Sequence, residues 1–366
     1  MWLVQARVVG VGPLADITFR FAEDGGAPRK LTVVMGGGGV GKTSLLAAIA
    51  STRPGYAAPQ LRPRVRAASS TATVGATAPP PPFVVTDWLL GEDDRARPHP
   101  LRVASPNAVL DEAEDESALR RREQSHFDRL AVESGFACIA FSGGRWFSRS
   151  PVLLSTPERT VARYDVRAPA SFDDATRADL ARDAKTALSF AAIGAALAKN
   201  SVHAHARRSA TSTEAFDCAM REAVAPLARL SGVAFVGVDP LTLDPIFEIE
   251  ATHRIVGFDE LATSARHLIA FAALTVRTLY AARPDRDPRR AEGLVLIDDV
   301  DVHQDAQVRR GIAGALREAL PNVQWILTAS SPEVTLGCAP SEVLALRRMT
   351  DAQHVELYEG DLALVH

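Results

Sequence analysis

The sequence predicts an α/β protein with a mostly parallel β-sheet flanked by helices, and two observations carry that prediction. Short apolar runs that suit buried parallel strands alternate with helical patterns toward both ends of the chain. One such run leads through a glycine-rich loop directly into a helix. The chain has 366 residues, 47% of them hydrophobic, so it can build a large core and intrinsic disorder is excluded. Domains of about 150 residues are common, so two or three structural units are expected.

Charge and composition narrow the class of protein. Lysine plus arginine numbers 41 and aspartate plus glutamate 44, a net charge of −3, which lacks the positive excess of a protein that coats nucleic acid. The three cysteines stand far apart with no CxxC spacing, which excludes a disulfide framework and a structural zinc site. The N-terminal stretch has no signal-peptide pattern and no apolar run is long enough to span a membrane. We therefore expect a cytoplasmic protein without a membrane partner.

Lysine is scarce, and arginine supplies nearly all of the positive charge. A GC-rich genome, which encodes arginine and alanine readily, is a sufficient explanation for three of the four lysines. The fourth, Lys42, belongs to the motif described below. The four lysines are Lys30, Lys42, Lys185 and Lys199.

The N-terminal part of the chain predicts strands around one helix. Alternating apolar residues at 4–8 and 17–21 have the period of half-buried strands, and the apolar run 31–35 suits a buried parallel strand. Residues 54–82 are rich in proline, alanine, serine and threonine, so a loop or linker is expected there. The other elements expected are a helix at 43–50, strands at 83–90, 101–104 and 136–141, and a charged helix that opens with the acidic cluster 111–116 and continues to about Leu130.

The second half of the chain alternates helices with strands, which favours a parallel sheet. A helical pattern covers about 171–230, with Ser171 as its expected N-cap. A buried strand at 293–297 leads into an acidic pair, Asp298 and Asp299. The remaining expected elements are strands at 233–249 and 323–328, helices at 261–283 and 308–319, and a small β region at 343–366.

The glycine-rich loop matches GxxxxGK[ST], the phosphate-binding P-loop, and it stands between a buried strand and a helix as that motif requires. Glycines let successive N–H groups turn toward phosphates, and the helix N-terminus adds partial positive charge. Lys42 is expected to reach the β/γ oxygens and Thr43 to ligate Mg²⁺. The competing interpretation is a glycine-rich turn that precedes Lys-Thr by chance. The residues expected to hold the nucleotide are Gly36, Gly37, Gly38, Gly39, Val40, Gly41, Lys42, Thr43 and Ser44.

The acidic pair after the strand 293–297 supplies the partner motif. An apolar strand that ends in two carboxylates can provide a second magnesium ligand, held through water, and a base for the attacking water. Asp298 is the candidate for the metal side and Asp299 the candidate base. An acidic turn at a sheet edge is the alternative interpretation of this motif taken alone.

About 250 residues separate the P-loop from the acidic pair, with a helical block between them. Compact P-loop GTPases and kinases place both motifs in one domain. This long spacing resembles the ABC-type ATPase heads of the RecF, SMC and OLD (overcoming lysogenization defect) group, over 1–50, about 136–150 and 233–335. The family pattern "pnvQ" followed by a strand ending in TTHSP is matched by Pro321-Asn-Val-Gln324 and Thr328-Ala-Ser-Ser-Pro332. The resemblance implies a P-loop NTPase fold with an N-terminal ABC-type β-subdomain and a helical lobe.

The chain departs from the family pattern where the resemblance places the trans and catalytic groups. The signature LSSGER corresponds to Leu261-Ala-Thr-Ser-Ala-Arg266, so Ala262, Ser264 and Ala265 replace its Ser, Gly and Glu. Asp299 is one methylene shorter than the usual Glu, and Ser330 replaces the switch His. Nucleotide binding is therefore expected, whereas fast hydrolysis is not. The family's Q-loop glutamine stays unassigned between Gln60 and Gln124.

Weaker features keep two interpretations each. The segment Phe141–Arg149 can bring Arg145 to the phosphates or into a partner groove, or it is a strand edge with buried aromatic residues. His303, just beyond the acidic pair, lies either near the nucleotide or on the surface, and the pair His203 and His205 lacks an acidic or Cys partner for a metal site. Basic spots that suit nucleic acid or a solvated patch occur at 61–66, 207–208 and 289–290.

The expected organisation is an ABC-type ATPase core formed by 1–50 and 233–366, a variable insert at 51–135, and a strand plus helical lobe at 136–232. The resemblance implies ATP and Mg²⁺ as ligands, and a homo-oligomer in which ATP is buried between two protomers, or a hetero-partner protein. Three functions remain open at this point. They are a slow or partner-stimulated ATPase in which Asp299 is the base, a nucleotide-sensing scaffold that does not hydrolyse ATP, and a DNA-associated ATPase of a defence or repair system.

Overall fold

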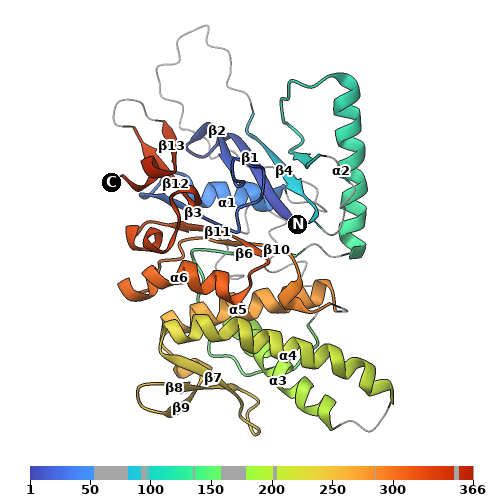
Figure 1. Ribbon diagram of the computed structural model, residues 1–366, viewed down its shortest axis with the longest axis vertical. Coiled ribbons are helices and arrows are strands. Elements are labelled where there is room, and N and C mark those ends of the chain that lie inside the picture. The colour runs from blue at the N-terminus through green and yellow to red at the C-terminus, as the bar shows by residue number, and fades with distance from the viewer. Residues whose placement is uncertain are drawn as a thin grey trace.

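The computed structural model describes residues 1–52, 81–91, 97, 99–134, 137–157, 179–200, 204–284, 286–349 and 354–365, without the side chains of 128–134 and 204–211. The predicted α/β class is confirmed. A mostly parallel sheet crosses the middle of the molecule, with an antiparallel sheet on one side and stacked helices on the other (Figure 1).

The central sheet has the strand order β13-β12-β3-β11-β10-β6, and all its neighbours pair in parallel except β12 and β13. Every residue of β10 and β11 is buried, as expected for strands covered on both faces. The carboxyl ends of β3, β11 and β10 therefore lie side by side at one edge. The strands are β3 (Leu31–Gly36), β6 (Cys138–Phe141), β10 (Gly293–Ile297), β11 (Val323–Ala329), β12 (Val343–Arg348) and β13 (Val355–Glu359).

An antiparallel sheet of order β2-β1-β4-β5 lies beside the central sheet, and α1 fills the space between them (Figure 1). Two of its strands, β4 and β5, come from the range 51–135 expected to form a separate insert. β4 pairs with β1, and β5 pairs with β4, and most residues of both strands are buried. The elements are β1 (Trp2–Val11), β2 (Leu14–Arg20), β4 (Phe83–Leu89), β5 (Leu101–Ala104), α1 (Lys42–Ser51) and α2 (Glu114–Ser134).

Helices cover the other face of the central sheet, with α5 and α6 next to it and α4 and α3 beyond them (Figure 1). A small antiparallel sheet, β7-β8-β9, follows α4. The expected cap Ser171 lies outside the described residues. Among the described helices, none is long and apolar enough to cross a membrane. The elements are α3 (Ala181–Lys199), α4 (Ala204–Leu230), β7 (Val233–Val238), β8 (Pro245–Ile249), β9 (Arg254–Gly257), α5 (Thr263–Ala282) and α6 (Ala306–Ala319).

Short helical elements join the main ones. Three-residue 3₁₀ turns precede α5 and β10, and a longer one follows β11. A last helical turn closes the chain after β13. They are η4 (Phe258–Glu260), η5 (Pro288–Arg290), η6 (Pro332–Gly337), η7 (Pro340–Glu342) and α7 (Asp361–Leu364).

One buried ammonium ties the helical lobe to the segment that leads into α5. Lys185 of α3 is 1% exposed, and its Nζ lies 2.9 Å from Asp259 Oδ2 and 3.1 Å from Asp244 Oδ1. An unpaired charge at such a depth is strongly destabilising, and these two carboxylates provide the compensating negative charge. The presence of lysine at position 185 is therefore explained by this buried ion pair as well as by codon usage.

Candidate functional site

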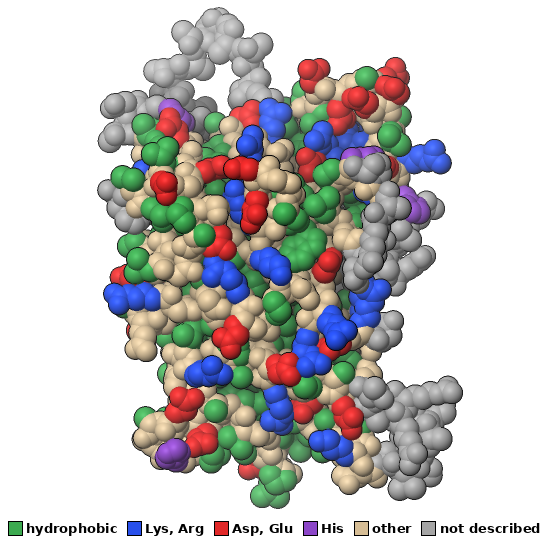
Figure 2. All heavy atoms as spheres, in the orientation of Figure 1, with side chains coloured by type: hydrophobic (Ala, Val, Ile, Leu, Met, Phe, Trp, Pro, Cys, Tyr) green, Lys and Arg blue, Asp and Glu red, His purple; other side chains and the backbone are tan. Residues whose placement is uncertain are grey.

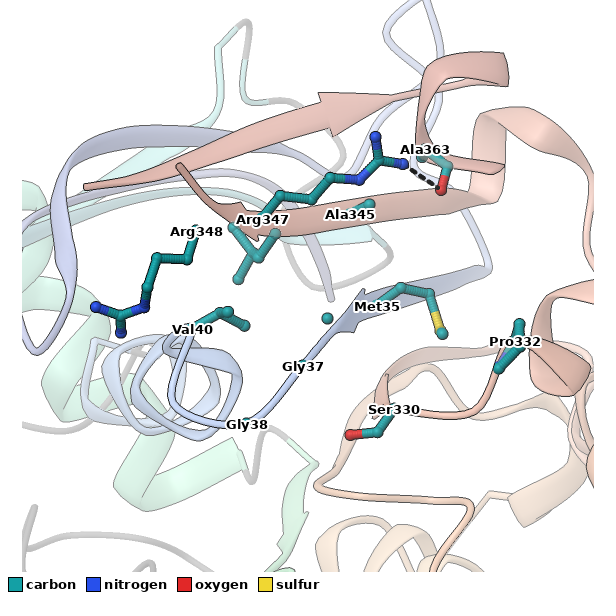
Figure 3. Close-up of a pocket in the computed structure, with 12 residues that line it drawn as sticks. Met35, Gly37, Gly38, Val40, Ser330, Pro332, Ala345, Arg347, Arg348 and Ala363 are labelled. Carbon is teal, nitrogen blue, oxygen red and sulfur yellow. Dashed lines mark hydrogen bonds between the residues drawn. The ribbon is translucent and has the colours of Figure 1, made fainter. Parts of the chain in front are cut away.

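The sequence-predicted site residues meet at the carboxyl ends of three neighbouring strands. The loop 36–41 leaves β3, the acidic pair follows β10, and Ser330 follows β11, which lies between the two. Figure 3 shows Gly37 and Gly38 of the loop close to Ser330. Ligand sites of open α/β sheets form at this edge because the strand ends and the helix N-termini converge there.

Glycine is required at two positions of this loop for different reasons. A Cβ on Gly36 would lie 2.7 Å from the carbonyl oxygen of Leu346, a backbone atom that cannot move aside cheaply. Gly41 has φ of +100°, and a Cβ there would lie 2.9 Å from Pro13 Cγ. The loop therefore depends on β12 and on the β1–β2 turn, both distant in sequence, for its shape.

The side chain of Lys42 turns back toward the glycine loop that precedes it. Its side chain is 7% exposed, and its Nζ donates to the carbonyl oxygens of Gly36 at 2.7 Å and Gly37 at 3.1 Å. The same nitrogen donates to Ser330 Oγ at 3.0 Å. The ammonium is thus surrounded by oxygen atoms at the N-terminus of α1, where the helix dipole favours an anion.

Asp298 is held on both carboxylate oxygens. Thr43 Oγ1 donates to Asp298 Oδ2 at 2.8 Å, and Thr328 Oγ1 donates to Asp298 Oδ1 at 2.6 Å. Asp298 is 2% exposed, and its main-chain N–H donates to the carbonyl oxygen of Phe141 on β6. The structure thus brings together the hydroxyl and the carboxylate that the sequence assigns to the metal.

Asp299 has a left-handed backbone, with φ of +45°. Its N–H donates to Thr328 Oγ1 at 2.7 Å. Burial, and then the neighbouring charge of Asp298, raise the pKa of the Asp299 carboxyl above its ordinary value. A non-glycine residue pays strain energy in this conformation, so surrounding contacts must hold it there.

A third carboxylate, Asp301, fixes the segment after β11. Asp301 Oδ2 accepts hydrogen bonds from the N–H groups of Ser330 at 3.1 Å and Ser331 at 2.8 Å. Ser330 is thereby presented to Lys42 by the loop that carries the acidic pair. Sequence reasoning assigned no role to Asp301, because the register between β10 and β11 decides its position.

The segment that follows β6 supplies the residues beneath the acidic pair. Arg145 is 4% exposed and donates to the carbonyl oxygens of Asp298 and Asp299, so it lies neither in a partner groove nor on the surface. Of the two glutamine candidates, Gln60 lies outside the described residues. Gln124 is on α2, where its Oε1 accepts from the Ala104 N–H. Residues 142–149, which follow β6 beside the acidic pair, contain no glutamine.

Arg348 was missed by sequence reasoning. Its Nη2 donates to the carbonyl oxygen of Gly39 at 2.8 Å, so β12 is bound directly to the glycine loop. A pocket of about 440 Å³ lies beside this contact, between the loop, β12 and the segment from Ser330 to Pro332 (Figure 3). Arg348 belongs to no recognisable sequence motif. Its contact with the glycine loop follows from the parallel pairing of β12 with β3, which the sequence does not show.

The segment resembling the signature motif forms the start of α5, next to the loop after the acidic pair. Gln304 Nε2 lies 3.5 Å from the Ser264 carbonyl oxygen, and the rings of His267 and His303 stack with centroids 5.2 Å apart. His303 is exposed, whereas His267 is buried and its Nδ1 bonds to the Thr263 carbonyl oxygen. His203 and the side chain of His205 lie outside the described residues.

His267 should make stability depend on pH. Burial lowers its pKa to about 3, so the folded chain keeps the ring neutral while the unfolded chain binds a proton below about pH 6.5. The free energy of unfolding should therefore fall with decreasing pH, by up to about 1.4 kcal/mol per unit from this group. The His267→Phe variant should lose less stability between about pH 7 and about pH 5 in urea titrations.

The control for this prediction is His126→Gln, because the side chain of His126 is exposed on α2, whereas that of His267 is buried. His126→Gln should lose stability with decreasing pH as steeply as the wild type does. An equally steep dependence in His267→Phe would show that other groups cause the acid sensitivity.

No family model matches the sequence. The order of the core strands, the loop between β3 and α1, and the acidic pair after β10 together define a P-loop NTPase fold with an ABC-type antiparallel sheet at its N-terminus. Solved structures of SMC heads share this fold. An SMC head bound to the C-winged helix domain of ScpA matches with a TM-score of 0.53 and 12% identity, over 98% of each chain.

A second SMC head has an extended coiled coil and is bound to the C-terminal domain of ScpA derived from Pyrococcus furiosus. It matches with a TM-score of 0.50 and 14% identity, over 98% of this chain and 96% of that one. The SMC head domain from Thermotoga maritima gives a TM-score of 0.47 and 12% identity, over 99% of this chain and 100% of that one. The two SMC heads solved with ScpA domains share the fold class predicted from the sequence.

Proposed function

We propose that this chain is an ATP-binding head of the ABC type that couples nucleotide binding to dimerisation and to assembly with a partner protein. One observation carries the proposal. Lys42, Thr43 and Asp298 converge at one sheet edge, where Thr43 Oγ1 and Asp298 Oδ2 are 2.8 Å apart and Lys42 Nζ lies within the glycine loop. This arrangement combines a charge clamp for phosphates with hard oxygen ligands.

The residues present suit Mg²⁺. A threonine hydroxyl and a carboxylate in hydrogen-bond contact are oxygen donors of the type that Mg²⁺ prefers, and Mg²⁺ usually completes its shell with water and phosphate oxygens. Thr43 and Asp298 would hold the ion, which would neutralise charge on the β- and γ-phosphates. The main-chain N–H groups at the start of α1 would bind the phosphate oxygens.

The hydrolytic part of the proposal assigns the base to Asp299. Its carboxylate would accept a proton from the water that attacks the γ-phosphorus, while Lys42 stabilises charge on the β/γ oxygens and ADP leaves. The replacements at Ala262, Ser264 and Ser330 remove groups that the family uses across the dimer and at the switch. Turnover by this chain is therefore expected to be slow or to require a partner.

A scaffold that binds ATP without hydrolysis is the second candidate, and the contact of Ser330 favours it. Ser330 Oγ accepts a hydrogen bond from Lys42, so the switch position offers a hydroxyl in place of an imidazole.

A DNA-associated ATPase, the third candidate function, has weaker support. Arg289 of the basic spot 289–290 is already paired with Asp287 and Glu222. Figure 2 shows positive and negative side chains intermixed over the face in view.

The proposal is tested by ATP titration in a calorimeter with and without Mg²⁺, together with the molar mass in light scattering. We expect Mg²⁺-dependent binding of ATP and a doubled mass with ATP but not with ADP. The partner-assembly part draws support from the two SMC heads solved with ScpA domains. Failure to bind any nucleotide would overturn the assignment of the site. Binding without a change in mass would limit it to nucleotide sensing.

A further inference from the structure

Arg145 is a buried cation directly beneath the acidic pair, and its hydrogen bonds go to the main chain. Its Nη1 donates to the carbonyl oxygens of Asp298 at 2.5 Å and Ser142 at 3.0 Å. Its Nη2 donates to the carbonyl oxygen of Asp299 at 2.8 Å. One planar guanidinium therefore holds two consecutive peptide units of the β10 exit loop.

The surroundings of Arg145 keep its charge in place despite its burial. The guanidinium carbon lies 5.1 Å from the centroid of the Phe271 ring, a cation–π distance, and Phe271 belongs to the buried face of α5. Burial lowers the pKa of Arg145 to about 10, and the charges of Asp298, Asp299 and Asp301 oppose that shift. Arg145 therefore stays protonated at neutral pH as a counter-charge to three carboxylates.

The backbone that Arg145 holds is a strained one. Asp299 has φ of +45°. Its N–H donates to Thr328 Oγ1, and its carbonyl oxygen accepts from Arg145 Nη2 at 2.8 Å and from the Val302 N–H at 3.1 Å. Such a conformation persists only where its surroundings determine it from more than one side. Loss of Arg145 would remove a donor from the Asp298 carbonyl oxygen and the shorter of these two bonds from the Asp299 carbonyl oxygen, so the strained Asp299 backbone should rotate more easily.

The position of Gly143 shows why that rotation would matter. A Cβ on Gly143 would lie 3.1 Å from Asp298 Oδ2 and 3.2 Å from Asp299 Oδ2. Both carboxylates therefore converge over this glycine, close to Thr43. A rotated Asp299 peptide would move its carboxylate out of that arrangement while the glycine loop and Lys42 remain unchanged.

We propose that Arg145 is a positioning residue for hydrolysis, which fixes the main chain of Asp298 and Asp299 so that the Asp299 carboxylate is held toward the attacking water. This role rests on the proposed ATPase function. The segment after β6 would thus contribute to turnover through Arg145 without contacting the nucleotide.

The test replaces Arg145 by methionine, which fills similar volume without charge or donors. We expect kcat to fall about 10- to 100-fold, as is usual when an outer residue that orients a catalytic group is lost. The Kd for ATP should stay within about threefold of the wild type, because Lys42 and the glycine loop are untouched. Arg145→Lys should recover part of kcat. The matched control Arg149→Met changes an exposed arginine of the same segment and should leave both constants unchanged.

A second measurement does not depend on turnover. In amide hydrogen exchange without nucleotide, Arg145→Met should lose protection at 298–301 while α1 and β11 keep theirs. Unchanged exchange at 298–301, or a fall in ATP affinity as large as the fall in kcat, would overturn the positioning role. A wild type that binds no ATP would refute the proposed function alone, because the exchange experiment still decides the role of Arg145.

Discussion

Lys42→Ala should weaken ATP binding about 100-fold. The ammonium lies between the Gly36 and Gly37 carbonyl oxygens and Ser330 Oγ, and residues 36–51 contain no other lysine. Hydrogen bonds to charged groups contribute about 1.5–3 kcal/mol each, so the loss of two bonds to phosphate oxygens should cost at least about 3 kcal/mol. Each 1.4 kcal/mol is about tenfold in affinity.

The measurement is calorimetric titration of ATP with Mg²⁺ present. Lys30→Ala, which removes an exposed lysine, is the matched control and should bind ATP as the wild type does. Lys42→Arg should also bind poorly, because a planar guanidinium is larger than the ammonium that the loop encloses. If Lys42→Ala binds ATP as tightly as the wild type, the glycine loop is not the phosphate site.

Asp299→Asn should lower the turnover of ATP at least about 100-fold while leaving ATP affinity within a few fold of the wild type. The amide keeps the size of the side chain but cannot accept a proton from water, and general-base catalysis contributes about 10²- to 10⁴-fold. Asp298 and Thr43 stay in place, so binding of Mg²⁺ and nucleotide should persist.

Steady-state phosphate release, measured with and without DNA, checks this prediction. Asp24→Asn, which changes an exposed carboxylate of the β2–β3 connection, is the control. Unchanged turnover in Asp299→Asn would show that another group is the base. No turnover in the wild type, together with tight and Lys42-dependent binding, would favour the scaffold. Salt-sensitive stimulation by DNA would favour the DNA-associated ATPase.

The sequence predicted the parts of the fold that local patterns determine. The loop 36–41, the strand before it and the helix after it are encoded by consecutive residues, and the fully apolar run of β10 indicates its buried place in the sheet. The antiparallel sheet was harder, because the pairing of β4 with β1 joins residues about 80 positions apart across a proline-rich stretch. Apolar alternation predicts a strand but does not name its neighbour.

The same holds for the site: contacts between recognisable motifs could be predicted, whereas contacts that depend on strand pairing could not. The contact of Thr43 with Asp298 follows from two motifs that each have a spacing rule. The contacts of Arg145 and Thr328 with the acidic pair depend on the pairing of β6, β10 and β11, and no spacing in the chain encodes it. Arg145 was singled out for its aromatic neighbours, but its partners could be identified only from the fold.

The distribution of lysines has a practical consequence for labelling. Lys42 and Lys185 are buried, and the N-terminal amino group is ion-paired with Glu292, whereas Lys30 and Lys199 are exposed. An amine-reactive reagent should therefore modify the folded chain at Lys30 and Lys199 and reach the other two ε-amino groups only when the chain opens. Mass spectrometry of the modified protein would distinguish molecules modified only at the two exposed lysines from molecules modified also at the two buried ones. The ratio of the two would measure how much of the chain is folded.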